Sequence, residues 1–110
     1  MAQVKDKIHS ILSNQQSVKL GELTFRNSLI LAPMAGICNM PFRLLMQELG
    51  AGGTVIELIS SHGINHGNDK TLEMLRIHPL EKNVGLQLFG EDATQMAQAA
   101  KKAQEFNPSF

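Results

Sequence analysis

The sequence has little of what marks several large classes of protein. Cys38 is the single cysteine among 110 residues, which excludes an intrachain disulfide framework and fits a reducing compartment. No apolar run approaches the roughly 20 residues of a membrane span, and residues 4–8 alternate charged and apolar side chains instead of building a signal core. We therefore expect a cytoplasmic protein with no membrane partner.

Net charge is also lacking, since ten basic and ten acidic side chains cancel. The chain thus has no broad positive field of the kind that draws proteins to nucleic-acid phosphates. A glycine-rich loop followed by Lys-Ser or Lys-Thr is missing too, so chemistry on nucleoside triphosphates is not expected. With 43% hydrophobic and 18% charged residues, the composition is that of one small globular domain.

Hydrophobic periodicity predicts an alternation of strands and helices. An amphipathic helix over 4–12 and a hairpin over 18–25 come first. They are followed by strands over 29–35, 54–60 and 83–89, helices over 41–49 and 70–75, a polar loop over 61–69, and a helix that begins after Asp92. This order is typical of right-handed β-α-β units on a parallel sheet. We divide the chain into a helical extension, residues 1–17, and a β/α domain, residues 18–110.

Three of these elements carry detailed expectations. Residues 29–35 are almost uninterruptedly apolar, which predicts a strand covered on both faces. In the strand over 83–89, Val84, Leu86 and Leu88 should face one side, and Gly85 and Gln87 the other. The last helix should be capped by Asp92, with Gln95 in capping-box position, and should end at Asn107-Pro108. Its apolar stripe should consist of Met96, Ala97, Ala100, Ala103 and Phe106.

Ligands of β/α folds collect at the carboxyl ends of the strands. Here these ends carry Pro33-Met34-Ala35-Gly36 and Gln87. A rigid ring beside small residues lets backbone groups approach a flat ligand, and the primary amide of Gln87 could pair with its edge. An ordinary strand exit and a glutamine bonded to backbone or water are the alternatives.

Other reactive side chains are interpreted as structural. Glu57 interrupts an apolar strand, and Arg43 on the preceding helix is a conceivable ion-pair partner. Cys38 has no neighbouring base that would make it a nucleophile. His62 and His66 have the spacing of metal ligands on a helix, but the glycines and asparagines around them predict a loop, so we expect no metal site.

Several motifs together resemble the opening part of the tRNA-dihydrouridine synthase family. They are Leu31-Ala32-Pro33-Met34-Ala35-Gly36, Pro41-Phe42-Arg43, Gly50-Ala51-Gly52, Glu57 with Ser60-Ser61, and Val84-Gly85-Leu86-Gln87-Leu88-Phe89-Gly90. The resemblance implies the N-terminal portion, about three β/α units, of a TIM-type (β/α)8 barrel that binds FMN. It also implies NADPH as reductant and reduction of uridine to 5,6-dihydrouridine in tRNA.

Carried over to this sequence, the resemblance implies that Pro33, Met34, Ala35 and Gln87 contact the flavin. The family's catalytic cysteine follows the fourth strand, whereas this chain reaches Phe110 where that strand would begin, so no catalytic residue is expected here. Cys38 is not its counterpart, because Ile37-Cys38-Asn39 stands where relatives more often have a threonine-aspartate pair. The later flavin-contacting lysine and histidine, the phosphate-holding loops and the helical domain are likewise not expected.

A complete β/α barrel needs roughly 250 residues, so we expect an inactive fragment of such an enzyme. One alternative is a non-catalytic half-barrel remnant that needs a partner chain to complete the barrel. Another is a different FMN-dependent barrel oxidoreductase that acts on a small molecule.

Overall fold

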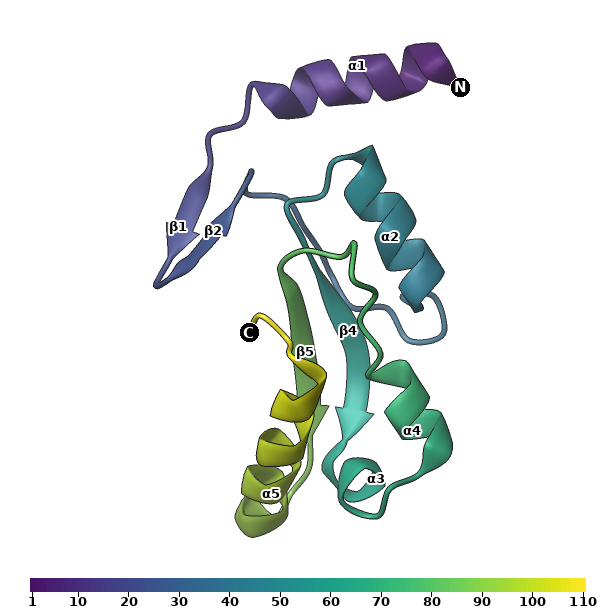
Figure 1. The fold of residues 1–110 in the computed structure, drawn as a ribbon, viewed down its shortest axis with the longest axis vertical. Coiled ribbons are helices and arrows are strands. Elements are labelled where there is room, and N and C mark those ends of the chain that lie inside the picture. Colours follow the sequence, from purple (N-terminus) through teal and green to yellow (C-terminus); the bar gives the residue numbers. More distant parts are fainter.

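The computed structural model describes the backbone of residues 1–110 and every side chain except that of Ser13. Figure 1 shows helices and strands alternating along most of the chain. In chain order they are α1 (Ala2–Ser13), β1 (Val18–Leu20), β2 (Leu23–Phe25), β3 (Ile30–Leu31), α2 (Met40–Leu49), β4 (Gly53–Ser60), α3 (Ser61–Asn65), α4 (Asp69–Met74), β5 (Val84–Phe89), α5 (Ala93–Ala103) and the 3-10 turn η1 (Gln104–Phe106).

The centre of the fold is a parallel sheet with the strand order β3-β4-β5. Thr54 pairs with both Leu31 and Val84, so the middle strand links the two outer ones at one register position. The prediction of an α/β fold with parallel strands is confirmed. The described residues form no closed barrel, and three adjacent parallel strands are consistent with a part of one.

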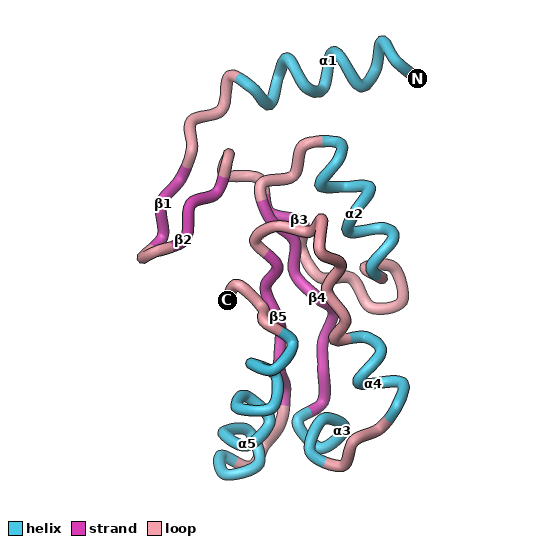
Figure 2. The backbone as a smooth tube through the Cα atoms, in the orientation of Figure 1, coloured by secondary structure: helices cyan, strands magenta, loops and turns pink.

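The hydrophobic core lies between β4, β5 and the helices that cover one face of the sheet. Its fully buried members are Ile56, Ile59, Ile64, Leu75, Val84, Ala99 and Ala103. Leu86 and Leu88 pack against this cluster, while Gln87 is exposed, so the predicted two-sided pattern of β5 is confirmed. Figure 2 shows the short strand β3 beside β4, on the side away from β5.

Helix α5 begins as predicted and, continued by the 3-10 turn η1, stops before Asn107 as predicted, but its buried stripe differs. The Asp92 carboxylate accepts a hydrogen bond of 2.7 Å from the Gln95 amide, and Asn107 adopts a left-handed conformation at φ 55° beyond η1. Ala99 is buried, whereas Ala97 and Ala100 are exposed, so the predicted stripe was wrong at these positions. Positions 96, 99, 103 and 106 follow the 3.6-residue repeat more closely, and positions 97 and 100 are rotated toward solvent.

The prediction of a doubly covered strand over 29–35 was wrong. Only Ile30 and Leu31 pair with β4, and Leu29 and Ile30 are 48% and 42% exposed. Two features explain the difference. Strand β3 is the edge of the sheet, so no neighbour covers its outer side, and Pro33 has no N–H group with which to extend the ladder.

The predicted loop over 61–69 was also wrong, because Ser61–Asn65 forms the short helix α3. The Ser60 hydroxyl caps it by accepting a hydrogen bond of 3.3 Å from the Gly63 amide. Gly63 is used for close packing and not for a turn, since a Cβ there would lie 2.7 Å from the Thr71 hydroxyl oxygen. The His62 and His66 rings stack with centroids 3.8 Å apart.

The N-terminal helix and hairpin, both predicted, extend from the sheet (Figure 1). Lys5 on α1 pairs with Glu48 on α2, and the Leu12 side chain lies against Gly50. The radius of gyration is 15.3 Å, above the roughly 13 Å expected for a compact domain of this length. Among the described residues no helix is both long and apolar enough to cross a bilayer.

Candidate functional site

The four predicted flavin contacts lie at the carboxyl edge of the parallel sheet. Pro33, Met34 and Ala35 follow β3 after one intervening residue, and Gln87 lies near the end of β5. Pro33 is half-buried, while Met34, Ala35 and Gln87 are exposed. Strand β4 separates the two groups, so they form two sections of one edge with β4 between them.

A β-bulge in β4 faces Gln87. Ile56 pairs with Leu86 and Ile59 pairs with Leu88, so Glu57 and Leu58 together stand opposite the single residue Gln87. The extra residue explains how Ile56 and Ile59, three positions apart, are both buried in the same core. Sequence reasoning missed this bulge. The apolar side chains at 56 and 59, which break strict alternation, are the signal that could have revealed it.

The segment after β3 is shaped by hydrogen bonds of its own. The Met34 carbonyl accepts from the amides of Ile37 and Cys38 at 3.1 and 3.0 Å. The Cys38 thiol, 1% exposed, accepts from the Met34 amide at 3.3 Å and donates to the Ala32 carbonyl at 3.4 Å. Cys38 is therefore a buried structural residue. A thiol with these two contacts can fill the place of a threonine hydroxyl, which also donates and accepts.

The Glu57 carboxylate is bound to the same segment, where it accepts a hydrogen bond from the Gly36 amide. Our hypothesis that Glu57 pairs with Arg43 was wrong. Arg43 instead forms a bidentate ion pair with Glu81, with N–O distances of 2.7 and 3.1 Å. The two carboxylates could not be told apart in the sequence, since folding brings the loop before β5 against α2.

Arg43 also braces the surrounding loops. Its guanidinium donates to the carbonyls of Cys38 at 3.1 Å and Arg76 at 2.9 Å. The side chains of Arg43 and Glu81 are 2% and 0% exposed, and the amide of His78 donates to Glu81 at 2.8 Å. Every charged group of this buried cluster thus has several partners, as buried ions require.

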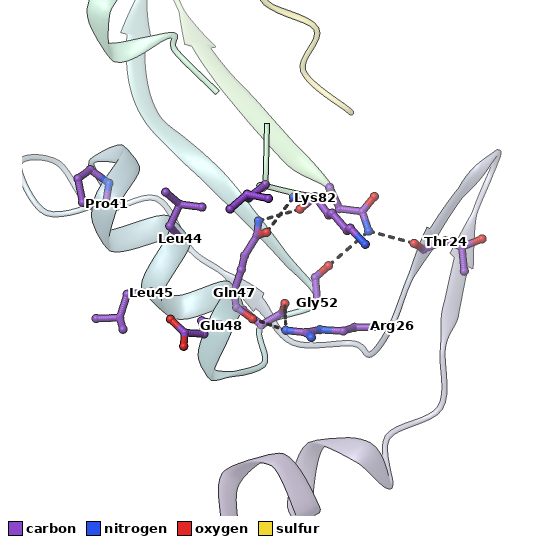
Figure 3. A pocket seen from close by; sticks show the side chains of 12 residues that line it. Thr24, Arg26, Pro41, Leu44, Leu45, Gln47, Glu48, Gly52 and Lys82 are labelled. Atoms are coloured by element: carbon purple, nitrogen blue, oxygen red, sulfur yellow. Dashed lines mark hydrogen bonds between the residues drawn. The ribbon is translucent and has the colours of Figure 1, made fainter. Parts of the chain in front are cut away.

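Two cavities flank the sheet. The larger, of about 780 Å³, lies at the amino end of the strands between α2, the hairpin and residues 80–83 (Figure 3). There Gln47 donates to the Lys82 carbonyl at 2.7 Å and accepts from its amide at 2.8 Å. The smaller, of about 440 Å³, is lined by Glu57 together with Cys38, Asn39, Met40, Pro41, Arg43, Lys70, Glu73, Met74 and Arg76. Since β/α folds bind ligands at the carboxyl ends, the smaller cavity is the one beside the candidate site.

His62 and His66 have the sequence spacing of metal ligands on a helix. His62 and His66 do lie together, and the His66 Nδ1 atom is 2.9 Å from the His62 carbonyl oxygen. No group of three or more His, Cys, Asp or Glu side chains is placed there to hold an ion.

Comparison with known proteins decides the family. Residues 30–108, which include all four predicted flavin contacts, match the dihydrouridine synthase family. The chain belongs to the dihydrouridine synthase family. It is 47% identical to tRNA-dihydrouridine synthase B of Pseudomonas putida over 88 residues, which are 77% of this chain and 25% of that protein. The proteins of the same name from Escherichia coli K12 and Proteus vulgaris are 41% and 39% identical over 85 residues, 76% of this chain and 26% of theirs.

The chain thus spans about a quarter of the length of the curated relatives that it matches. Helix α1 and the hairpin lie before the region that matches the family. No solved structure gave a significant match.

Proposed function

We propose that residues 18–110 form the first three β/α units of a tRNA-dihydrouridine synthase barrel, and that Pro33, Met34, Ala35 and Gln87 form one wall of its FMN site. The observation that carries the proposal is the position of these residues. All four lie at the carboxyl edge of one parallel sheet, within the region that matches the family. This edge is where barrel enzymes hold their ligands.

The side chains present fit the pyrimidine edge of a flavin. Gln87 is exposed and, among the described residues, its side-chain amide makes no hydrogen bond within the chain. A primary amide can both donate and accept, which suits a ring edge that carries an N–H group beside a carbonyl. On the other side of β4, the small side chain of Ala35 and the exposed Met34 leave room for a flat ring system.

FMN would supply hydride transfer to the uracil ring when bound and reduced, with NADPH as the reductant in the complete enzyme. The 110 residues would bind and orient the ring. Cys38 would not serve as a proton donor to the substrate, because its thiol is buried and bonded within its own loop. In the presence of tRNA, FMN and NADPH, we expect the purified chain to form no dihydrouridine, and NADPH-dependent formation would refute this division of roles.

Flavin titration tests the proposed wall. Because the predicted contacts reach the ring and not the phosphate, riboflavin and FMN should bind with equal affinity, on the order of 0.1 mM. Gln87→Leu should weaken both about fivefold through loss of one hydrogen bond. Gln98→Leu, at an exposed position of α5, is the matched control and should change nothing. A chain that quenches neither ligand, or a Gln87→Leu variant with unchanged affinity, contradicts the proposal.

A second candidate is a non-catalytic half-barrel that folds against a partner chain. The exposed apolar side chains of Ile30, Leu58 and Phe89, on all three strands of the sheet, favour it. Sedimentation and denaturation over a range of concentrations separate the candidates. A monomer with concentration-independent cooperative unfolding would count against the need for a partner. The third candidate, a different flavin oxidoreductase, loses its support through the family match.

A further inference from the structure

We propose that Glu57 is a positioning residue, which holds the strand end Pro33–Gly36 in the conformation that receives the flavin ring. This inference rests on the proposed function. Its central observation is the hydrogen bond from the Gly36 amide to the Glu57 carboxylate, which ties β4 to the segment that follows β3. A hydrogen bond to an ionised acceptor is stronger than one between neutral groups.

The backbone of Gly36 needs such an anchor. Gly36 has φ 75°, and a Cβ built there would meet no atom within 4 Å. The glycine is therefore required by backbone conformation and not by crowding, and packing does not hold it in place. The carboxylate on the neighbouring strand supplies the restraint instead.

Two side chains together bracket the flavin-facing residues. The Cys38 thiol accepts from the Met34 amide at 3.3 Å, and Glu57 accepts from the Gly36 amide. Ala35 lies between these two fixed amides. A segment held at both ends loses little conformational freedom when a ligand arrives, which is the usual gain from preorganisation.

The bulge in β4 links this restraint to Gln87. Glu57 belongs to the pair of residues that stands opposite Gln87 in the ladder, between Ile56–Leu86 and Ile59–Leu88. Bulges near functional sites commonly redirect a side chain. The bulge in β4 therefore lies beside both sections of the proposed wall. Its Glu57 binds the segment after β3, and it stands opposite Gln87 in β5.

Glu57 is free for this role because the buried arginine is engaged elsewhere. Arg43 is paired with Glu81, and the other charged side chains around the cavity beside Glu57 are Lys70, Glu73 and Arg76. The Glu57 side chain is half-buried. It is therefore an acceptor for the segment after β3 and not a member of the buried ion pair.

Three variants test the role of Glu57. Glu57→Ala removes the acceptor, Glu57→Gln keeps a neutral one, and Glu73→Gln changes a carboxylate that lines the same cavity from α4. Amide hydrogen exchange at Gly36 is measured in the ligand-free chain, and riboflavin affinity by fluorescence quenching. Glu57→Ala should exchange Gly36 about tenfold faster and bind riboflavin about tenfold more weakly. Glu57→Gln should stay within about threefold in both measurements, and Glu73→Gln should match the unsubstituted chain.

The two readouts separate this inference from the proposed function. Unchanged exchange at Gly36 in Glu57→Ala overturns the positioning role, whatever the chain binds. Faster exchange with unchanged riboflavin affinity also overturns it, because the hydrogen bond would then be structural only. An unsubstituted chain that binds no flavin overturns the proposed function, and any role of Glu57 in flavin binding falls with it.

Discussion

Arg43 on α2 and Glu81 in the loop before β5 form a bidentate ion pair in the interior, with N–O distances of 2.7 and 3.1 Å. The pair joins the helix after β3 to the approach of β5 and reaches the Cys38 carbonyl, so it supports the loop beside the candidate site. Arg43 within Pro41-Phe42-Arg43 therefore has a structural role, which the sequence alone left open.

Arg43→Met should destabilise the chain by about 3–5 kcal/mol, because Glu81 would keep its charge without a partner in the interior. The measurement is urea denaturation followed by circular dichroism. Arg76→Met is the matched control, since the Arg76 side chain is exposed, and it should change the free energy of unfolding by less than about 0.5 kcal/mol. Equal changes in the free energy of unfolding would show that the buried ion pair contributes no more to stability than the exposed Arg76 side chain.

The surface ion pair between Lys5 and Glu48 should behave differently. The hydrogen bond from Lys5 and the attraction of its charge lower the pKa of Glu48 below its ordinary value. A lowered carboxyl pKa stabilises the folded state above the unfolded pKa, and this contribution is lost as pH falls through the folded pKa. Contact between α1 and α2 should therefore weaken in acid, while neutral pH should leave it intact.

An NMR titration of the Glu48 carboxyl carbon measures this effect. Lys5→Met should raise the pKa of Glu48 toward its ordinary value, and added salt should act in the same direction. Lys7→Met removes a charge from the same helix but not the partner of Glu48, so it is the control. If Lys5→Met left the pKa of Glu48 unchanged, the ion pair would not persist in solution.

The Cys38 thiol should be protected from solvent by its burial, and it should support the Met34 amide by accepting its hydrogen bond. Cys38→Ala removes both contacts of the thiol and should cost about 1–2 kcal/mol of stability. Cys38→Ser keeps a donor and an acceptor in nearly the same place, so its cost should be smaller. Urea denaturation compares the two variants. In the unsubstituted chain a thiol reagent should react slowly until denaturant is added, and immediate reaction would contradict the buried position.

Much of the fold could be predicted because its signals are local. Asn39, Pro41 and Gly50 mark the start and the end of α2, and the Asn39 side chain accepts from the Phe42 amide at 3.1 Å as an N-cap. An aspartate, which the family resemblance implies at position 39, would cap the helix in the same way. Likewise Val84, Leu86 and Leu88 fixed the faces of β5 through simple alternation.

The errors arose where a distant neighbour decides the outcome. The pairing of Arg43 with Glu81 joins residues 38 positions apart, and nothing near Arg43 distinguishes Glu81 from Glu57. The exposure of Ile30 follows from the position of β3 at the sheet edge, which its apolar sequence does not reveal. Gly63 suggested a turn, yet its lack of a side chain makes room for Thr71 on the next helix.

Gly85 and Phe110 provide the last test, at the face of the sheet that also carries Gln87. A Cβ at Gly85 would lie 2.3–2.8 Å from three carbons of the Phe110 ring, and this ring also packs edge-on against Phe25 at 5.7 Å. The Ser109 amide donates to the Val84 carbonyl at 2.7 Å, and the Leu86 amide donates to the Phe110 carbonyl at 2.9 Å. Residues 109 and 110 therefore lie along β5, and Gly85 leaves room for the ring.

Gly85→Ala should displace the Phe110 ring and cost about 1 kcal/mol, a moderate value because the ring belongs to an exposed residue that can shift. Phe110→Ala alone should cost a similar amount through loss of the contact with Phe25. In the Phe110→Ala background, Gly85→Ala should cost almost nothing, since the clash is gone. Urea denaturation of all four proteins completes the cycle. Strictly additive costs would mean that the Phe110 ring does not lie over Gly85.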